Sequence, residues 1–354
     1  MTTMTARLQR RNAAINWHQF AWITAIVSLG MLAQLWLQLG VTAYLALFPV
    51  MAVTAINDFS VAGVLKGLLP VWLLALLALL VSELFAAHPA VIWCISVLLF
   101  DRIRCWANTP AKIGAAMIPL LNWFLVVVFA QHSSIAMTDW LRDMAVSLVV
   151  TVMVVQLVRV LLPGSEPKVQ RAAQPKPQPQ AQTQPQIRPA VPAMTLTHRH
   201  RLVFVSLLGA GLAFMMMVDI VAATFCMMPV IAAAAQTQQT NYQAVIRGCL
   251  QAHVGGCAVA LLFVAALMGQ HHHLLVYGVA LTALVALVAY WICTSQGPIR
   301  AMHNQAMLGI MLPLQLYLGS TDLGLQDTFQ RGGMMLFVLI LLLACQGVIF
   351  GKQN

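Results

Sequence analysis

The chain has 354 residues, of which 61% are hydrophobic and only 8% are charged. Soluble domains carry roughly 25% charged residues, so the composition excludes a soluble globular protein and indicates an integral membrane protein. The apolar runs lack the alternation of β-strands and therefore predict helices rather than a barrel. The formal net charge of +10 suggests contact with anionic lipid headgroups and not with nucleic acid, because no compact basic domain holds these charges.

In the first half, apolar segments predict helices near residues 18–39, 41–57, 66–86, 89–101, 112–131 and 143–163. The first follows three arginines, as in a signal sequence, but its length and the lack of a small-x-small cleavage site favour an uncleaved helix. The second and the fourth are short, since a bilayer core of about 30 Å asks for about 20 residues. We expect these two to be tilted, extended by their flanks or re-entrant.

A tract rich in Pro and Gln separates the two halves. It gives the chain nothing to bury and is expected to form an extended, disordered hinge. The expected organisation is a cytoplasmic tail (1–15), a first membrane repeat (16–163), the cytoplasmic linker (164–198) and a second membrane repeat (199–350).

The second half predicts helices near residues 201–218, 220–236, 247–269, 274–294, 304–319 and 331–350. With about six spans in each half, nearly all Lys and Arg fall on the side of the termini and the linker, and only Arg142 and Arg331 fall opposite. Because cytoplasmic loops are enriched in Lys and Arg, this pattern predicts an all-α, multi-pass protein of about twelve transmembrane helices. Both termini would be cytoplasmic, and the membrane would be the bacterial inner membrane.

The halves resemble each other in sequence. FPVMAVTAINDFSVAGVLKGLLP is echoed by MPVIAAAAQTQQTNYQAVIRGCLQ, and KIGAAMIPLL is echoed by AMLGIMLPLQ. The matched residues are Pro49 and Pro229, Lys66 and Arg247, and Pro119 and Pro313. An even number of spans and a cytoplasmic hinge give both copies the same orientation, and such duplications commonly place a transport path at their interface.

The short PV-containing second helix and the basic-Gly step that follows it, VLKG and VIRG, resemble the fusaric acid resistance or aromatic acid exporter family. The similarity is greatest to its short members, which are encoded beside HlyD-type membrane fusion proteins. Longer members carry a soluble domain where this chain has only the linker. The resemblance implies an inner-membrane efflux component for small, often aromatic, organic acids, with a periplasmic adaptor and an outer-membrane channel as partners.

Charged groups at membrane depth are costly and therefore mark candidate functional residues. Arg142 and Arg331 are expected to open the sixth helix of each copy. They would either receive a carboxylate substrate at the outer mouth, through planar bidentate contacts, or pair with nearby Asp139, Asp143 or Asp327.

Asp219, framed by apolar residues, is the first candidate for proton coupling, and Asp58 is the second. Either carboxylate also fits a plain turn or helix-end role. Lys66 and Arg247 would attract an anion from the cytoplasm or anchor a helix end among headgroups. The prolines Pro49, Pro229, Pro119 and Pro313 lie within spans, where each removes a backbone donor.

Neither a metal nor a cofactor is expected. The run His271 to His273 does not share one helix face, the seven cysteines form no CxxC, and His253 reads as an interior histidine. The chain also lacks GxxxxGK[ST], so transport by this chain would draw on an ion gradient. The polar residues are too sparse for a catalytic cluster, which argues against an enzyme.

These observations favour a proton-driven exporter of small organic anions. The alternative is a membrane scaffold that transports nothing and recruits a periplasmic adaptor or an envelope-assembly protein. Substrate identity and oligomeric state, including a homo-oligomer, stay open at this point.

Overall fold

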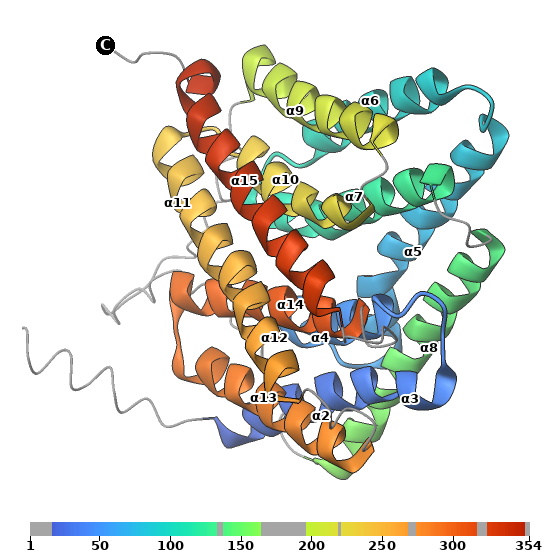
Figure 1. Ribbon diagram of the computed structural model, residues 1–354, viewed down its shortest axis with the longest axis vertical. Helices are drawn as coiled ribbons and strands as arrows, with labels where there is room; N and C mark the ends of the chain where they lie inside the picture. Colours follow the sequence, from blue (N-terminus) through green and yellow to red (C-terminus); the bar gives the residue numbers. More distant parts are fainter. Residues whose placement is uncertain are drawn as a thin grey trace, which may run out of the picture.

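The computed structural model describes residues 16–132, 137–163, 196–218, 221–267, 274–316 and 324–350, and all regular structure in these ranges is helical (Figure 1). The first half contains α2 (Trp17–Leu32), α3 (Gln34–Leu37), α4 (Tyr44–Ala55), α5 (Val61–Leu84), α6 (Pro89–Trp106), α7 (Pro110–His132) and α8 (Met137–Leu161).

The second half contains α9 (His198–Met217), the 3₁₀-helix η1 (Val221–Cys226), α10 (Met227–Ala234), α11 (Gln239–Cys249), the π-helix η2 (Leu250–Val254), α12 (Gly255–Ala266), α13 (Leu274–Thr294), α14 (Gly297–Leu316) and α15 (Leu325–Phe350). The expected cytoplasmic tail and residues 164–195 of the linker lie outside the described residues, and α9 begins at His198, the last residue of the expected linker.

The third helix of the first half begins earlier in the sequence than expected, because Ser60 caps it. The Ser60 hydroxyl accepts the N–H of Gly63 at 3.0 Å, as an N-cap does, so α5 begins at Val61 and not near residue 66 as expected. Lys66 therefore lies inside α5 rather than opening it.

The corresponding helix of the second half also starts early. α11 begins at Gln239 instead of near residue 247, because Tyr242, Ile246 and Cys249 recur at helical spacing and are buried in a stretch that is otherwise polar. Arg247 therefore lies near the end of α11, and α11, η2 and α12 form one continuous helical rod.

The short second helices are buried on all sides. In α4 every residue from Tyr44 to Val53 is buried, and in α10 every residue is. A helix of 12 residues spans only about 18 Å, less than a bilayer core of about 30 Å. The expectation of a short second helix in the first half is confirmed, and protein rather than lipid surrounds it. The fourth helix, α6, was also expected to be short but continues to Trp106 and has 18 residues.

Longer helices supply hydrogen bonds at the ends of these short ones. Arg104 of α6 is buried and donates through Nη2 to the carbonyl of Ala235, the C-cap of α10, at 3.0 Å. Its Nη1 donates to the carbonyl of Ala107 at 2.8 Å. On the approach to α4, Thr42 donates to the carbonyl of Gln315 in α14 at 2.6 Å.

The two halves exchange packing partners. In Figure 1, α9 lies along α6 at the top and α2 lies along α13 at the bottom. At the centre, α4 packs against α14 and α10 packs against α7. The first helix of each half thus packs on the fourth helix of the other, and the second helix packs on the fifth.

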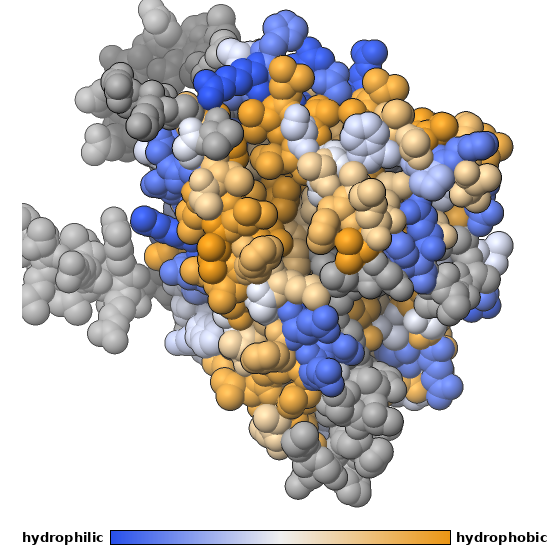
Figure 2. All heavy atoms as spheres, turned by 45° about the horizontal axis from the view of Figure 1, so that its top comes forward, coloured by the Kyte–Doolittle hydropathy of each residue, from blue (hydrophilic) through white to orange (hydrophobic). Residues whose placement is uncertain are grey.

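Eight helical stretches among the described residues are long and apolar enough to cross a membrane. They are 17–37, 61–84, 111–132, 138–161, 198–217, 239–266, 275–294 and 325–347. Many of their large apolar side chains are exposed, including Leu80, Met153 and Phe337, and Figure 2 shows broad apolar areas on the surface. These features support a multi-pass membrane protein, because lipid makes an apolar exterior favourable.

Two glycines bring the rod and α14 into close contact. A Cβ on Gly256 would lie 2.8 Å from the carbonyl carbon of Gly309, and one on Gly309 would lie 2.5 Å from the Ala252 carbonyl oxygen. The neighbouring Gly255 has open space in the direction of its Cβ. Small residues permit such approaches between membrane helices.

This contrast gives a matched pair of variants. Gly256→Ala should lower the free energy of unfolding by about 1–3 kcal/mol, because backbone atoms must shift to admit the methyl group. Gly255→Ala should leave it unchanged or raise it by up to about 1 kcal/mol through helix propensity. Thermal unfolding of the purified protein in detergent measures both, and equal melting temperatures would contradict the close contact.

Candidate anion-binding cavity

Helix ends from both halves surround a cavity of about 1300 Å³. The first half contributes the end of α4, the first half of α5 and the junction between α6 and α7. The second half contributes the junction between α13 and α14. The cavity reaches from these helix ends inward to Leu74 and Pro119.

The lining of the cavity is apolar with a positive rim. Lys66 and Arg300 are its charged residues, and no acidic residue is among the described residues that line it. Val71, Ile103, Ile118 and Trp106 provide apolar wall. An apolar cleft with a few converging polar groups is the usual form of a small-molecule site, and this charge favours an anion.

Neutral polar side chains complete the rim. They are Thr54, Asn57, Thr294, Ser295, Gln296 and Asn304. The Oδ1 of Asn304 has no hydrogen-bond partner among the described residues. A buried polar atom normally has one, so Asn304 provides an unused hydrogen-bonding position in the wall.

Two helix prolines add acceptors to the wall. Pro70 of α5 and Pro119 of α7 both line the cavity. A proline inside a helix cannot donate to the carbonyl four residues earlier, which leaves the carbonyls of Lys66 and Ala115 without that bond. Both of these residues also line the cavity.

Two residues that the sequence analysis singled out line the cavity. Lys66 was expected to attract an anion or to anchor a helix end, and Pro119 was expected to interrupt a span. Arg300, Asn304 and Pro70 were missed, although Arg300 belongs to the basic residues of the expected cytoplasmic side. Arg247, the counterpart of Lys66 in the second half, is exposed on α11 and does not line the cavity.

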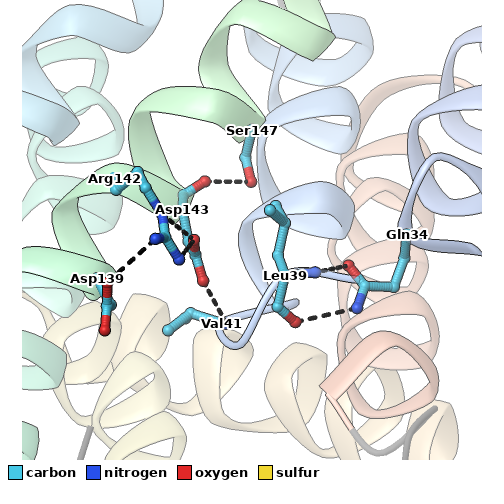
Figure 3. A network of polar contacts seen from close by, with 7 residues as sticks. All are labelled: Gln34, Leu39, Val41, Asp139, Arg142, Asp143 and Ser147. Carbon is cyan, nitrogen blue, oxygen red and sulfur yellow. Dashed lines mark hydrogen bonds and ion pairs between the residues drawn. The ribbon is translucent and has the colours of Figure 1, made fainter. Parts of the chain in front are cut away.

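α8 begins at Met137 and α15 begins at Leu325, so neither Arg142 nor Arg331 opens its helix as expected. Arg142 takes part in a network near the start of α8 (Figure 3). Its side chain is 65% exposed and contacts Asp139 through Nη1 at 3.2 Å. It contacts Oδ1 of Asp143 through Nη2 at 3.1 Å. Asp143 is buried, and its Oδ2 accepts the N–H of Val41 at 3.0 Å. Arg142 therefore pairs with Asp139 and Asp143, as the second of its two expected roles describes.

The same network fixes the turn before α4. The Gln34 amide donates to the carbonyl of Leu39 at 3.0 Å and accepts its N–H at 3.2 Å. Figure 3 shows Gln34 and Asp143 holding this turn from its two sides. The polar backbone between α3 and α4 is thus satisfied by side chains.

Arg331 lies in a different environment. It is 3% exposed, and its guanidinium stacks over the ring of Phe225 at 4.5 Å from the centroid. Buried residues recur at matching positions on α8 and α15: Trp140 with Thr328, Asp143 with Arg331, Ser147 with Met335, and Thr151 with Leu339. When the two helices are aligned by their buried positions, Arg331 corresponds to Asp143. The sequence comparison instead matches Arg331 with Arg142.

Asp58 has the geometry of a turn residue. Its Oδ1 accepts the N–H of Ser60 at 2.9 Å, and this bond lowers the pKa of the Asp58 carboxyl, with a smaller contribution from the Ser60 side chain. A lowered pKa keeps the carboxylate ionised at neutral pH, which favours the helix-end alternative over proton coupling. Asp219 and His271 to His273 lie outside the described residues.

The remaining helix prolines lie in the core. Pro49 is buried within α4, Pro229 within α10 and Pro313 within α14, and none of the three lines the cavity. Helix shaping is the role that their positions support. His253 is buried in η2, and the described residues hold no cluster of His, Cys, Asp and Glu that could bind a metal.

A family model described as Protein of unknown function (DUF2955) matches residues 22–158 of the chain. The match runs from α2 into α8 and includes the cavity residues of the first half, among them Lys66, Pro70 and Pro119. No curated protein and no solved structure matches the chain.

Asp143 and Asp139 provide a second matched pair. Asp143→Asn should lower the free energy of unfolding by about 1.5–3 kcal/mol, because a buried charge-assisted hydrogen bond is lost. Asp139→Asn, which removes an exposed ion pair, should cost about 0–1 kcal/mol. Thermal unfolding of the two purified variants checks the difference. A larger effect at Asp139 would contradict the role of Asp143 in holding the turn before α4.

Proposed function

We propose that the protein is an inner-membrane transporter component that exports small organic anions, aromatic acids among them. The cavity between the two halves is the observation that carries this proposal. It is large enough for a drug-sized molecule, since ligand sites measure about 300–1,000 Å³. Lys66 and Arg300 at its rim suit a carboxylate, and Trp106 and the aliphatic wall suit an aromatic or apolar body.

The proposal includes about twelve spans in two parallel repeats. The reciprocal packing of α2 with α13 and of α9 with α6 is what two equivalent six-helix units would produce. A contact between two helix ends agrees with this membrane topology: Arg199 at the start of α9 donates to the carbonyl of Ile349 near the end of α15 at 3.0 Å. The topology puts both of these helix ends on the cytoplasmic side.

The cavity lies on that same side. It is surrounded by the ends of α4, α6 and α13 and by the starts of α5, α7 and α14. The proposed topology puts all six of these helix ends on the cytoplasmic side. An anion would therefore enter from the cytoplasm, attracted by a positive rim. At another contact between the two halves, α6 and α9 are joined by a bidentate ion pair, in which Nη2 of Arg201 lies 2.7 Å from Oδ2 of Asp101.

Energy and partners complete the proposal. A proton gradient would drive export. An HlyD-type membrane fusion protein and an outer-membrane channel would carry the substrate onward, as the resemblance to the fusaric acid resistance family implies. Asp219 stays the candidate for proton coupling, because Asp58 is tied to Ser60.

Transport by inverted membrane vesicles tests the cavity. We expect labelled benzoate to accumulate when a pH gradient is imposed and to be lost with an uncoupler. The double variant Lys66→Gln/Arg300→Gln should slow initial uptake about tenfold or more, since charge-assisted bonds contribute roughly 1.5–3 kcal/mol each.

Arg247→Gln is the matched control, because it removes the equivalent charge of the second half outside the cavity. Its uptake should stay within about twofold of the wild type. Equal loss in the control and in the double variant would reject the cavity as the substrate site. No uptake by folded wild-type protein would favour the scaffold alternative.

Reporter fusions test the membrane topology. We expect a fusion at Gln131 to report the periplasm and one at Gln180 to report the cytoplasm, because α7 ends at the outer side and the basic linker stays inside. Alkaline phosphatase and green fluorescent protein fusions give opposite readouts for the two sides. A periplasmic signal at Gln180 would overturn the orientation.

A further inference from the structure

Arg331 is a buried cation that leaves part of its hydrogen-bonding capacity unused among the described residues. Its side chain is nine-tenths or more buried, and both Nε and Nη1 lack a hydrogen-bond partner among the described residues. Arginine stays protonated in proteins, so the charge persists at this depth. An uncompensated buried charge is strongly unfavourable unless an anion pairs with it.

Among the described residues no carboxylate forms an ion pair with Arg331, and Asp327, one turn earlier on α15, is exposed. The guanidinium faces the ring of Phe225, and Cys226, Cys257 and His253 lie within electrostatic range of it. Thr224, next to Phe225, has a fully buried hydroxyl that also lacks a partner. A cation and a hydroxyl without partners are therefore buried on two elements, α15 and η1, that pack together.

The first half shows what a completed version of this position looks like. Asp143 occupies the matching place on α8, and its carboxylate is satisfied by the N–H of Val41 and by Arg142. The position therefore holds a paired acid in one half and, in the other, a base without an ionic partner among the described residues. Symmetric packing explains the shared burial but does not explain a charge that no described residue pairs.

The local backbone also departs from regular geometry at this place. His253 lies in the π-helix η2, which packs against α15, and π-bulges are frequent at functional sites. The backbone of His253 contacts Gly309 of α14, the same helix whose residues Ala301 and Asn304 line the cavity. One helix thus connects the cavity wall with the surroundings of Arg331.

We propose that Arg331 of α15, with Thr224 of the neighbouring η1, forms a second, internal binding site for a monocarboxylate, separate from the cavity. The planar guanidinium offers Nε–H and Nη1–H to the two carboxylate oxygens, and the Thr224 hydroxyl offers a further hydrogen bond. Phe225 holds the guanidinium by a cation–π contact. Only the place of this site on an export path, after the cavity, rests on the proposed function; the binding itself does not.

Benzoate binding to the full-length protein in lipid nanodiscs tests this site. The measurement uses the background Lys66→Gln/Arg300→Gln, which removes the charges of the cavity. We expect a saturable benzoate site to persist in this background. Adding Arg331→Met should weaken it about tenfold or more, the factor expected when a charge-assisted hydrogen bond is lost. Adding Arg142→Met, which removes the exposed and paired arginine, should change it less than about twofold.

Thermal unfolding without benzoate separates binding from packing. Arg331→Met should keep or raise the melting temperature, because an uncompensated charge is replaced by an apolar side chain of similar length. If that variant does not fold, Arg331→Lys takes its place, since lysine keeps the charge but loses the planar fork. About tenfold weaker binding in whichever variant folds supports the site.

Three results would overturn the proposal. They are the absence of saturable benzoate binding in the Lys66→Gln/Arg300→Gln background, unchanged binding when folded Arg331→Met or Arg331→Lys is added, and occupation by chloride with exclusion of benzoate. The transport assay decides the cavity independently. Normal uptake by Lys66→Gln/Arg300→Gln would reject the cavity and leave the Arg331 site standing.

Discussion

The burial of two short helices, α4 and α10, is the constraint on which the rest of the structure depends. Both are too short to cross a bilayer core of about 30 Å, and neither faces lipid, since their residues are buried on all sides. Backbone groups at helix ends need partners where water is scarce. The longer helices supply them: Arg104 reaches the end of α10, and Asp143 holds the turn before α4.

The charged groups at depth fall into two kinds once these bonds are assigned. Arg104 donates through both Nη atoms to backbone carbonyls, and Asp143 accepts a backbone N–H and pairs with Arg142, so these contacts explain how the fold tolerates both charges. Lys66 and Arg300 line an open cavity, and Arg331 is enclosed with donors unused. The functional argument rests on the second kind, because a satisfied charge needs no ligand to account for it.

Much of the architecture follows from hydropathy alone. Nearly every predicted helical range coincides with a helix, because a long apolar run in a membrane protein has few alternatives. The starts of α5, α8, α11, α14 and α15 lie five to eight residues before the predicted ones. The cap at Ser60 sets the start of α5, and the buried face of Tyr242 and Ile246 extends α11 into polar sequence. Such extensions are decided by tertiary packing, which hydropathy does not report.

The candidate site was less accessible to sequence reasoning. Lys66 and Pro119 were found through the similarity of the two halves. Arg300 and Asn304 come from a junction that approaches α5 only in three dimensions. The two arginines of the sixth helices were paired by residue type, whereas burial pairs Arg331 with Asp143. Residue type is a poor guide to which positions of the two halves correspond when the residues at those positions carry opposite charges.

The exchange of partners between the halves also has a consequence for biogenesis. During synthesis, α2 and α6 enter the membrane well before α13 and α9, the helices that will cover them. The first half must therefore persist in the bilayer with unfilled packing surfaces while the linker and the second half are made. Contacts of such long sequence separation form late and slowly, so chaperones and membrane proteases meet an incomplete assembly first.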